Sequence, residues 1–175
     1  LTNYNVMIFD QSFGNSSSLS LMNTNMLQSD NERNANVTGI FTQINNKDNT
    51  HTYALETKMS QESEGDEFSK GFSGMLSVRK TSGKYQYNLY SIFEDDKYNP
   101  NDLGFLYSNN EITNGISLSY HQFNESKRFI NLSNELEIKH QTLFTDHKFV
   151  DLELELETRL TCLLYTSDAA DDVRG

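Results

Sequence analysis

Hydrophobic and polar residues alternate with a period of two along much of this chain. In the run 112–120, Ile112, Ile116, Leu118 and Tyr120 fall on one side, whereas small and polar residues fall mainly on the other. Aliphatic residues at positions 150, 152, 154 and 156 alternate with acidic residues in the same way. A period of two is that of a strand with one buried and one solvated face. No helical period competes over a comparable length, so the pattern predicts an all-β protein.

Nine candidate strands follow from this pattern and from the turn residues between them. Most runs are about ten residues or longer, compared with about five or six in soluble sheets and nine to eleven for a tilted membrane strand. We expect strands over residues 4–10, 17–27, 35–44, 51–61, 71–81, 85–95, 111–123, 129–140 and 148–160. Their length favours the wall of a transmembrane barrel.

The connections between these strands alternate in length. Residues 11–14, 45–49, 82–84 and 124–127 form short turns, whereas residues 28–34, 62–70 and 96–110 form longer polar loops. Outer-membrane barrels have short turns on one rim and larger loops on the other, whereas sandwiches mix loop lengths at both ends. We therefore predict an antiparallel up-and-down meander that forms about nine strands of a larger transmembrane β-barrel.

Composition and charge narrow the classes of partner. Only 35% of residues are hydrophobic, but the chain has 9 Tyr, 11 Phe and a single Pro, which favours an ordered β protein over a disordered one. The net charge of −11 disfavours a nucleic-acid partner, because phosphate binding needs clustered Lys and Arg. No run of about 18 apolar residues is present, so the sequence predicts no transmembrane helix.

The connection at 96–110 contains the only proline and the most distinctive motif of the chain. Asn, Pro, Asp and Gly are turn residues, so we expect side-chain-to-backbone hydrogen bonds to hold this loop while Leu103, Phe105 and Leu106 anchor it. The alternative is a Ca²⁺ site formed by the side-chain and backbone oxygens. The motif consists of Tyr98, Asn99, Pro100, Asn101, Asp102, Leu103, Gly104, Phe105 and Leu106.

Several short motifs together resemble one protein family. They are Phe9-Asp10-Gln11-Ser12, Asn23-Thr24-Asn25, Asn45-Asn46-Lys47, Lys80-Thr81-Ser82-Gly83-Lys84 and the nine-residue loop motif. They resemble the C-terminal β-barrel region of Gram-negative surface proteins, a domain of unknown function numbered 5916, which usually follows a carbohydrate-binding-module-like domain. The resemblance implies an outer-membrane location, outer-membrane lipid as a partner, and glycans bound through an N-terminal domain missing from this sequence. It carries over no catalytic residue.

The resemblance covers residues 1–161, which we expect to be an outer-membrane β-barrel fragment cut at both ends. Residues 162–175 have a different origin in our interpretation. The segment that begins at Cys162 resembles a sequencing-library adapter translated in frame, and we expect it to be a disordered artefact.

A row of acidic residues on the last two strands is the most conspicuous charged feature. Such a row could form a metal site or a glycosidase-like carboxylate pair, but a water-filled lumen also needs a polar inner wall. We expect the row to be part of the polar inner wall. Lys58, Arg79 or Arg128 would then point into the same lumen and relieve the repulsion between like charges. The predicted acidic inner face consists of Glu135, Glu137, Asp151, Glu153, Glu155 and Glu157.

Other catalytic or cofactor signals are weak. The four histidines have no metal-ligand spacing, and Cys162 lies in the tail that we exclude. No nucleophile elbow, phosphate loop or dinucleotide fingerprint is present. The sequence therefore predicts no enzyme activity, no cofactor and no metal.

Three functions are consistent with these observations. The leading one is a non-enzymatic barrel fragment in the cell outer membrane, an anchor or conduit for a missing carbohydrate-related domain, with Leu152, Leu154 and Leu156 facing lipid. The second is a soluble secreted β-sandwich that binds glycans through exposed Tyr and Phe. The third is part of a surface glycan hydrolase whose catalytic residues lie elsewhere.

Overall fold

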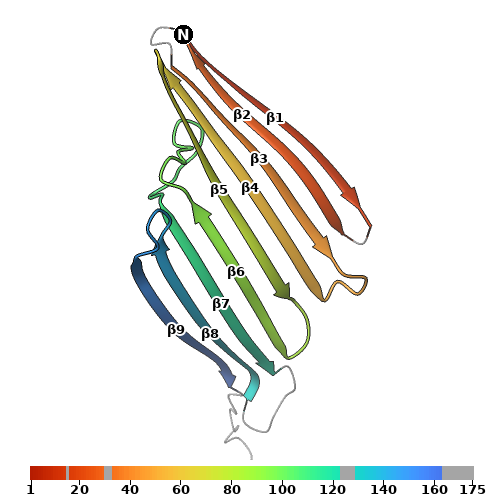
Figure 1. Cartoon of the computed structure of the whole chain (residues 1–175). Helices are drawn as coiled ribbons and strands as arrows, with labels where there is room; N and C mark the ends of the chain where they lie inside the picture. The colour runs from red at the N-terminus through yellow and green to blue at the C-terminus, as the bar shows by residue number, and fades with distance from the viewer. Residues whose placement is uncertain (15, 30–32, 123–128, 163–175) are drawn as a thin grey trace, which may run out of the picture.

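The computed structural model describes residues 1–14, 16–29, 33–122 and 129–162. These residues form one antiparallel sheet in which each strand pairs with its neighbours in sequence, in the order β1 to β9 (Figure 1). No helix within the described residues is long and apolar enough to cross a membrane. The strands are β1 (Thr2–Phe13), β2 (Ser17–Gln28), β3 (Arg33–Asn45), β4 (His51–Glu64), β5 (Glu67–Lys80), β6 (Tyr85–Glu94), β7 (Glu111–Gln122), β8 (Phe129–Leu143) and β9 (Phe149–Cys162).

The prediction of nine antiparallel strands is confirmed, but the predicted alternation of loop lengths is wrong at two of the three expected long loops. The connection expected over 28–34 is shorter, because β2 continues to Gln28, β3 begins at Arg33, and these two residues pair. Residues 62–70 are not a long loop, because β4 and β5 continue until Glu64 pairs with Glu67. Gly65 and Asp66 alone form the turn, with Gly65 at a φ of +57°. The residues here show no alternation because polar side chains occupy both faces, whereas main-chain hydrogen bonding does not require alternation. The only long connection within the described residues is 95–110.

The register divides the strand residues between two faces, which we call the polar face and the apolar face. Residues that pair across strands share a face, so the pairing of Ser60 with Val37 and Gly71 identifies the polar face on three strands. Applied to the whole sheet, this rule places every Asp and Glu of the strands on the polar face. These residues are Asp10, Glu56, Glu62, Glu64, Glu67, Glu94, Glu111, Glu135, Glu137, Asp151, Glu153, Glu155 and Glu157.

The apolar face carries most of the aliphatic and aromatic side chains, together with a hydrogen-bonded cluster of Asn23, Asn36 and Thr38 on β2 and β3. Its only Lys or Arg residues are Lys70 and Lys80, and both lie on β5. Leu152, Leu154 and Leu156 of β9 lie on this face and are each more than half exposed. The described residues therefore form one layer whose apolar side has no second layer against it.

Strand β6 ends before its neighbour β5 does at one end of the sheet (Figure 1). Pairing between β5 and β6 stops where Ser73 meets Glu94, so the first part of β5 extends beyond β6. The chain then continues as the connection 95–110, which we call the β6–β7 loop. This loop crosses the polar face directly above Gly71, because a Cβ at Gly71 would lie 2.2 Å from the carbonyl carbon of Lys97. Any side chain larger than hydrogen would displace the loop.

Replacement of Gly71 by Ala is predicted to destabilise the protein by about 1–3 kcal/mol, the usual cost of overpacking. The new methyl group would collide with backbone atoms of the loop, which cannot rotate away as a flexible side chain can. Chemical denaturation of the purified protein measures the change in the free energy of unfolding.

The matched control is Gly104→Ala, at a glycine within the loop itself. A Cβ there would lie 3.6 Å from the carbonyl oxygen of Pro100, which is an ordinary contact, so we expect a much smaller change. Equal stability of the two variants would contradict the close approach of the loop to Gly71.

Candidate functional site

The β6–β7 loop, the polar strand residues beneath it and the acidic row on β8 and β9 contain the residues that the sequence singled out. Asp95 begins the loop and holds the free part of β5. Its backbone N–H donates to the carbonyl of Phe72 at 3.0 Å, and its carboxylate accepts from the Phe72 N–H at 2.8 Å. Asp95 thus takes over the hydrogen-bonding role of β6 for one more residue of β5.

Tyr98 is the main anchor of the loop on the polar face. Its side chain is only 5% exposed, and the next backbone N–H, of Asn99, donates to Ser60 Oγ at 3.0 Å. Burial raises the pKa of the Tyr98 phenol, and the nearby charge of Glu94 raises it further. The neutral phenol is therefore favoured at this position.

The predicted side-chain-to-backbone hydrogen bonds are present in the loop. Asn99 Oδ1 accepts from the Asn101 N–H at 3.1 Å, and Asn101 Oδ1 accepts from the Leu106 N–H at 2.7 Å. The Leu103 N–H also donates to the Pro100 carbonyl at 2.8 Å, as in a hydrogen-bonded turn. These bonds occupy oxygens that the calcium alternative would need as ligands.

The predicted apolar anchor is wrong for Phe105. Its side chain is 85% exposed, whereas Leu103 and Leu106 are partly buried. Tyr98 contributes the burial instead, because it lies close to the end of β6, where the loop meets Gly71. The hydrophobicity of the loop residues alone did not reveal which of them faces the sheet.

An ion pair ties the tip of the loop to the start of β3. Arg33 Nη2 lies 2.8 Å from Asp102 Oδ2, and Arg33 Nη1 lies 3.9 Å from Glu64 Oε2 on β4. Asp102 is therefore used to fix the loop. Within the described residues, no group of three or more His, Cys, Asp and Glu side chains has an arrangement that could hold a metal ion.

A cavity of about 290 Å³, which we call the loop slot, lies between the loop and strands β2 to β4. Lys58 lies beside it, with its ammonium 5.7 Å from the centre of the Phe41 ring and 3.1 Å from Glu56 Oε2. Residues of the sheet and of the loop line opposite walls, among them Met22, Val37 and Phe41 on one side and Pro100, Leu103 and Phe105 on the other. The slot can accept an apolar group next to a charged rim.

The pairing of β8 with β9 brings the predicted acidic residues together in two facing rows. Glu135 pairs with Glu157, and Glu137 pairs with Glu155. Asp151 lies on the same face and pairs with Gln141, and Glu153 pairs with Lys139. These acids lie on an exposed sheet surface, whereas a glycosidase pair flanks a substrate cleft.

The charges that relieve this repulsion come from β8 and β9 themselves. Lys139 Nζ lies 2.5 Å from Glu153 Oε2, and Arg159 Nε lies 2.6 Å from Glu157 Oε1. Lys58, one of the cations expected to serve this purpose, is paired with Glu56 on its own strand. Arg79 also lies on the polar face, on β5, and Arg128 lies outside the described residues.

Tyr90 adds a hydrogen bond from an uncharged donor to the acidic rows. It is located on β6, and its hydroxyl reaches across β7 to donate to Glu137 Oε1 at 3.1 Å. Gly115 of β7 makes this possible, because a Cβ there would lie 2.1 Å from the Tyr90 ring. The sequence interpretation missed Tyr90, Gly115 and Gly71, although glycine within a strand is a recognised signal of close approach.

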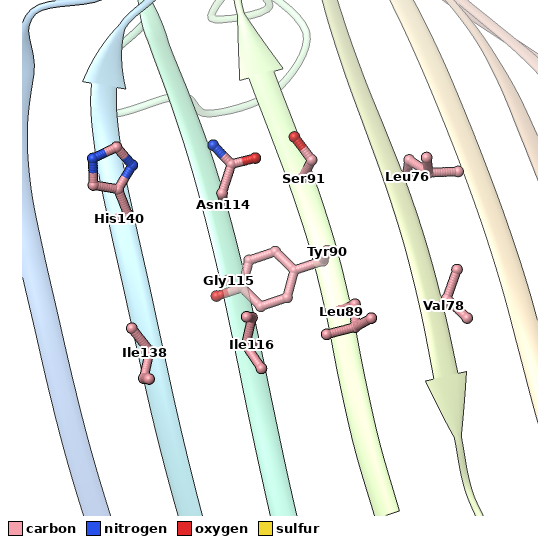
Figure 2. Close-up of a pocket in the computed structure, with 10 residues that line it drawn as sticks. All are labelled: Leu76, Val78, Leu89, Tyr90, Ser91, Asn114, Gly115, Ile116, Ile138 and His140. Carbon is pink, nitrogen blue, oxygen red and sulfur yellow. The ribbon is translucent and has the colours of Figure 1, made fainter.

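A shallow depression of about 440 Å³ lies on the apolar side of the sheet. Figure 2 shows its lining residues on four adjacent strands, β5 to β8, and the Tyr90 ring beside Gly115. Tyr90 and Gly115 belong to the polar face, whereas the other lining residues belong to the apolar face. Apolar side chains form most of its surface, including Leu76, Val78, Leu89, Ile116 and Ile138. Its open, apolar surface suits acyl chains better than a polar substrate.

Replacement of both Asn101 and Asp102 by Ala is predicted to lower stability by roughly 1–2 kcal/mol, from one lost hydrogen bond and one partly exposed ion pair. Because these groups bond to Leu106 and Arg33, the loss should be the same with Ca²⁺ and with a chelator. Thermal unfolding of the purified protein provides the measurement. The control is Asp96→Ala, at an exposed acid of the same loop. A melting temperature that depends on Ca²⁺ in the parent but not in the double variant would favour a metal site.

Comparison with known proteins gives one match. A family model described as "Domain of unknown function (DUF5916)" matches residues 1–167, which include the whole sheet and the β6–β7 loop. No curated protein and no solved structure matches the chain. The tail assigned to an adapter lies outside the described residues from position 163 onward. The chain belongs to the DUF5916 family, a family of unknown function.

Proposed function

We propose that this chain is a non-enzymatic section of the wall of a β-barrel in the cell outer membrane, where it acts as an anchor or conduit for a carbohydrate-related domain. The observation that carries the proposal is the division of charge between the two faces. Every acidic residue of the strands lies on the polar face, whereas the opposite face is mainly apolar and has Lys70 and Lys80 as its Lys and Arg residues within the described strands.

The physical argument rests on what must cover the apolar face. Burial of one Leu or Phe side chain contributes about 1.5–3 kcal/mol, so a sheet with this whole face in water would forgo most of its stabilisation. The described residues supply no second layer. Acyl chains would cover the face, and a barrel would satisfy the main-chain hydrogen bonds that lipid cannot.

The position of the aromatic residues supports the same orientation. On the apolar face, Tyr53, Tyr85 and Tyr120 lie towards one end of the strands, and the Tyr85 and Tyr120 rings are 5.1 Å apart. Phe93 and Phe149 lie towards the other end. Leucine, isoleucine and valine predominate between them on β6 to β9. Aromatic residues at both ends of an aliphatic band are typical of membrane interfaces.

The second candidate, a soluble β-sandwich that binds glycans, needs another sheet over the apolar face. The single layer favours the barrel wall over this arrangement. The third candidate, a part of a glycan hydrolase, would place its chemistry in another part of the protein, because the carboxylates of this sheet lie in exposed rows.

Labels at positions 154 and 155 test the proposal, because these neighbours lie on opposite faces of β9. We would introduce Leu154→Cys or Glu155→Cys into a Cys162→Ser background, attach a fluorescent dye and reconstitute the protein in lipid vesicles. Brominated lipids should quench the dye at position 154, and aqueous iodide should quench the dye at position 155.

The two positions act as controls for each other, since both labels share the strand and the local backbone. If iodide quenches both dyes equally while the protein remains folded, the apolar face does not contact lipid. Dissolution without detergent, together with specific binding to immobilised glycans, would support the sandwich instead.

A further inference from the structure

The polar face is not uniformly polar, because an apolar strip interrupts it on β1, β2 and β3. Val6 and Ile8 of β1 lie on this face and are 66% and 64% exposed. Ile8 pairs with Met22, which continues the apolar surface onto β2. We define the apolar strip as Tyr4, Val6, Ile8, Met22, Val37 and Phe41.

The centre of strand β1, residues 6–9, is consequently apolar on both sides. Met7 and Phe9 project from the apolar face and are as exposed as Val6 and Ile8 are on the polar face. A strand that separates lipid from water needs only one apolar side, whereas hydrophobic residues on both sides are typical of strands covered on both faces. The apolar strip therefore requires a partner on the polar side of the sheet.

The β6–β7 loop already covers one end of the strip, and it leaves the loop slot open. The strip residues Met22, Val37 and Phe41 form the sheet wall of this slot. Phe105 lines it from the loop side with its ring almost fully exposed. The slot is thus continuous with the strip and can hold one large apolar side chain of a partner.

The charges beside the strip define what kind of partner fits. Asp10 lies on the same face of β1 as Ile8, Glu56 pairs with Phe41, and Glu62 pairs with Ala35. The two nearby cations are already engaged, because Arg33 pairs with Asp102 and Lys58 pairs with Glu56. Acyl chains cannot cover this strip without bringing the acids into hydrocarbon. A second copy of the chain would oppose acids with acids.

We propose that the apolar strip and the loop slot bind a polypeptide segment that carries both apolar and basic side chains. One apolar side chain occupies the slot, others cover Val6 and Ile8, and Lys or Arg residues pair with Asp10 and Glu62, because Glu56 is already paired with Lys58. The inference uses only the sheet, the loop and their charges. It can therefore fail while the proposed outer-membrane location holds, and the reverse is also true.

A dye attached to Val6→Cys in a Cys162→Ser background reports on the strip in the detergent-solubilised protein. The probes are three synthetic peptides, built from Leu and Lys, from Leu and Glu, and from Ser and Lys. The Leu and Lys peptide should shift the dye emission to the blue and bind about tenfold more tightly than the Leu and Glu peptide, a factor that two exposed ion pairs supply together. It should also bind more tightly than the Ser and Lys peptide, which has no apolar side chains to cover the strip. The matched control is Phe9→Cys, on the other face of the same strand.

Three results would overturn the proposal. The first is equal binding of the Leu and Lys peptide and the Leu and Glu peptide, which would show that charge does not select the partner. The second is an equal response from the dye at position 9, which would show adsorption to the detergent-covered face. The third is an apolar environment at position 6 before any peptide is added, which would show that detergent or lipid covers the strip.

Discussion

The in-register pairing of neighbouring antiparallel strands is the constraint on which the other features of this structure depend. A slip of one residue between two strands would turn every side chain of one strand to the opposite face. The register holds the acidic residues on one side from Asp10 on β1 to Glu157 on β9. A sheet built in this way presents two chemically different surfaces, and each surface needs a different environment.

The β6–β7 loop adds the second level of organisation, because it joins several strands across the polar face. Asp95 holds β5, Tyr98 lies against Gly71, and Asp102 reaches Arg33 on β3. These contacts fix the loop by backbone geometry, burial and one ion pair. In a closed barrel such a loop would narrow the space beside the polar face. The polar face itself presents two zones. One zone is acidic on β8 and β9, and the other is apolar on β1 to β3.

Local patterns in the sequence were sufficient to predict most of the fold. Alternation and the turn residues between the runs together predicted nine strands at about the observed positions, because both signals depend only on neighbouring residues. It also placed Leu154 and Glu155 on opposite faces. Alternation failed at 62–70, where polar residues on both sides concealed a hairpin that is held by main-chain hydrogen bonds.

The amino-acid sequence by itself therefore determined the strands, their two faces and the hydrogen bonds within the loop motif, since these arise between residues close in the chain. Only the tertiary structure decided where the loop lies and which side chain anchors it. The burial of Tyr98 depends on Gly71 and Ser60, and Asp102 meets Arg33 from a distance of 69 positions. No local pattern encodes such contacts, because they exist only after the register has brought β3, β4 and β5 beside one another.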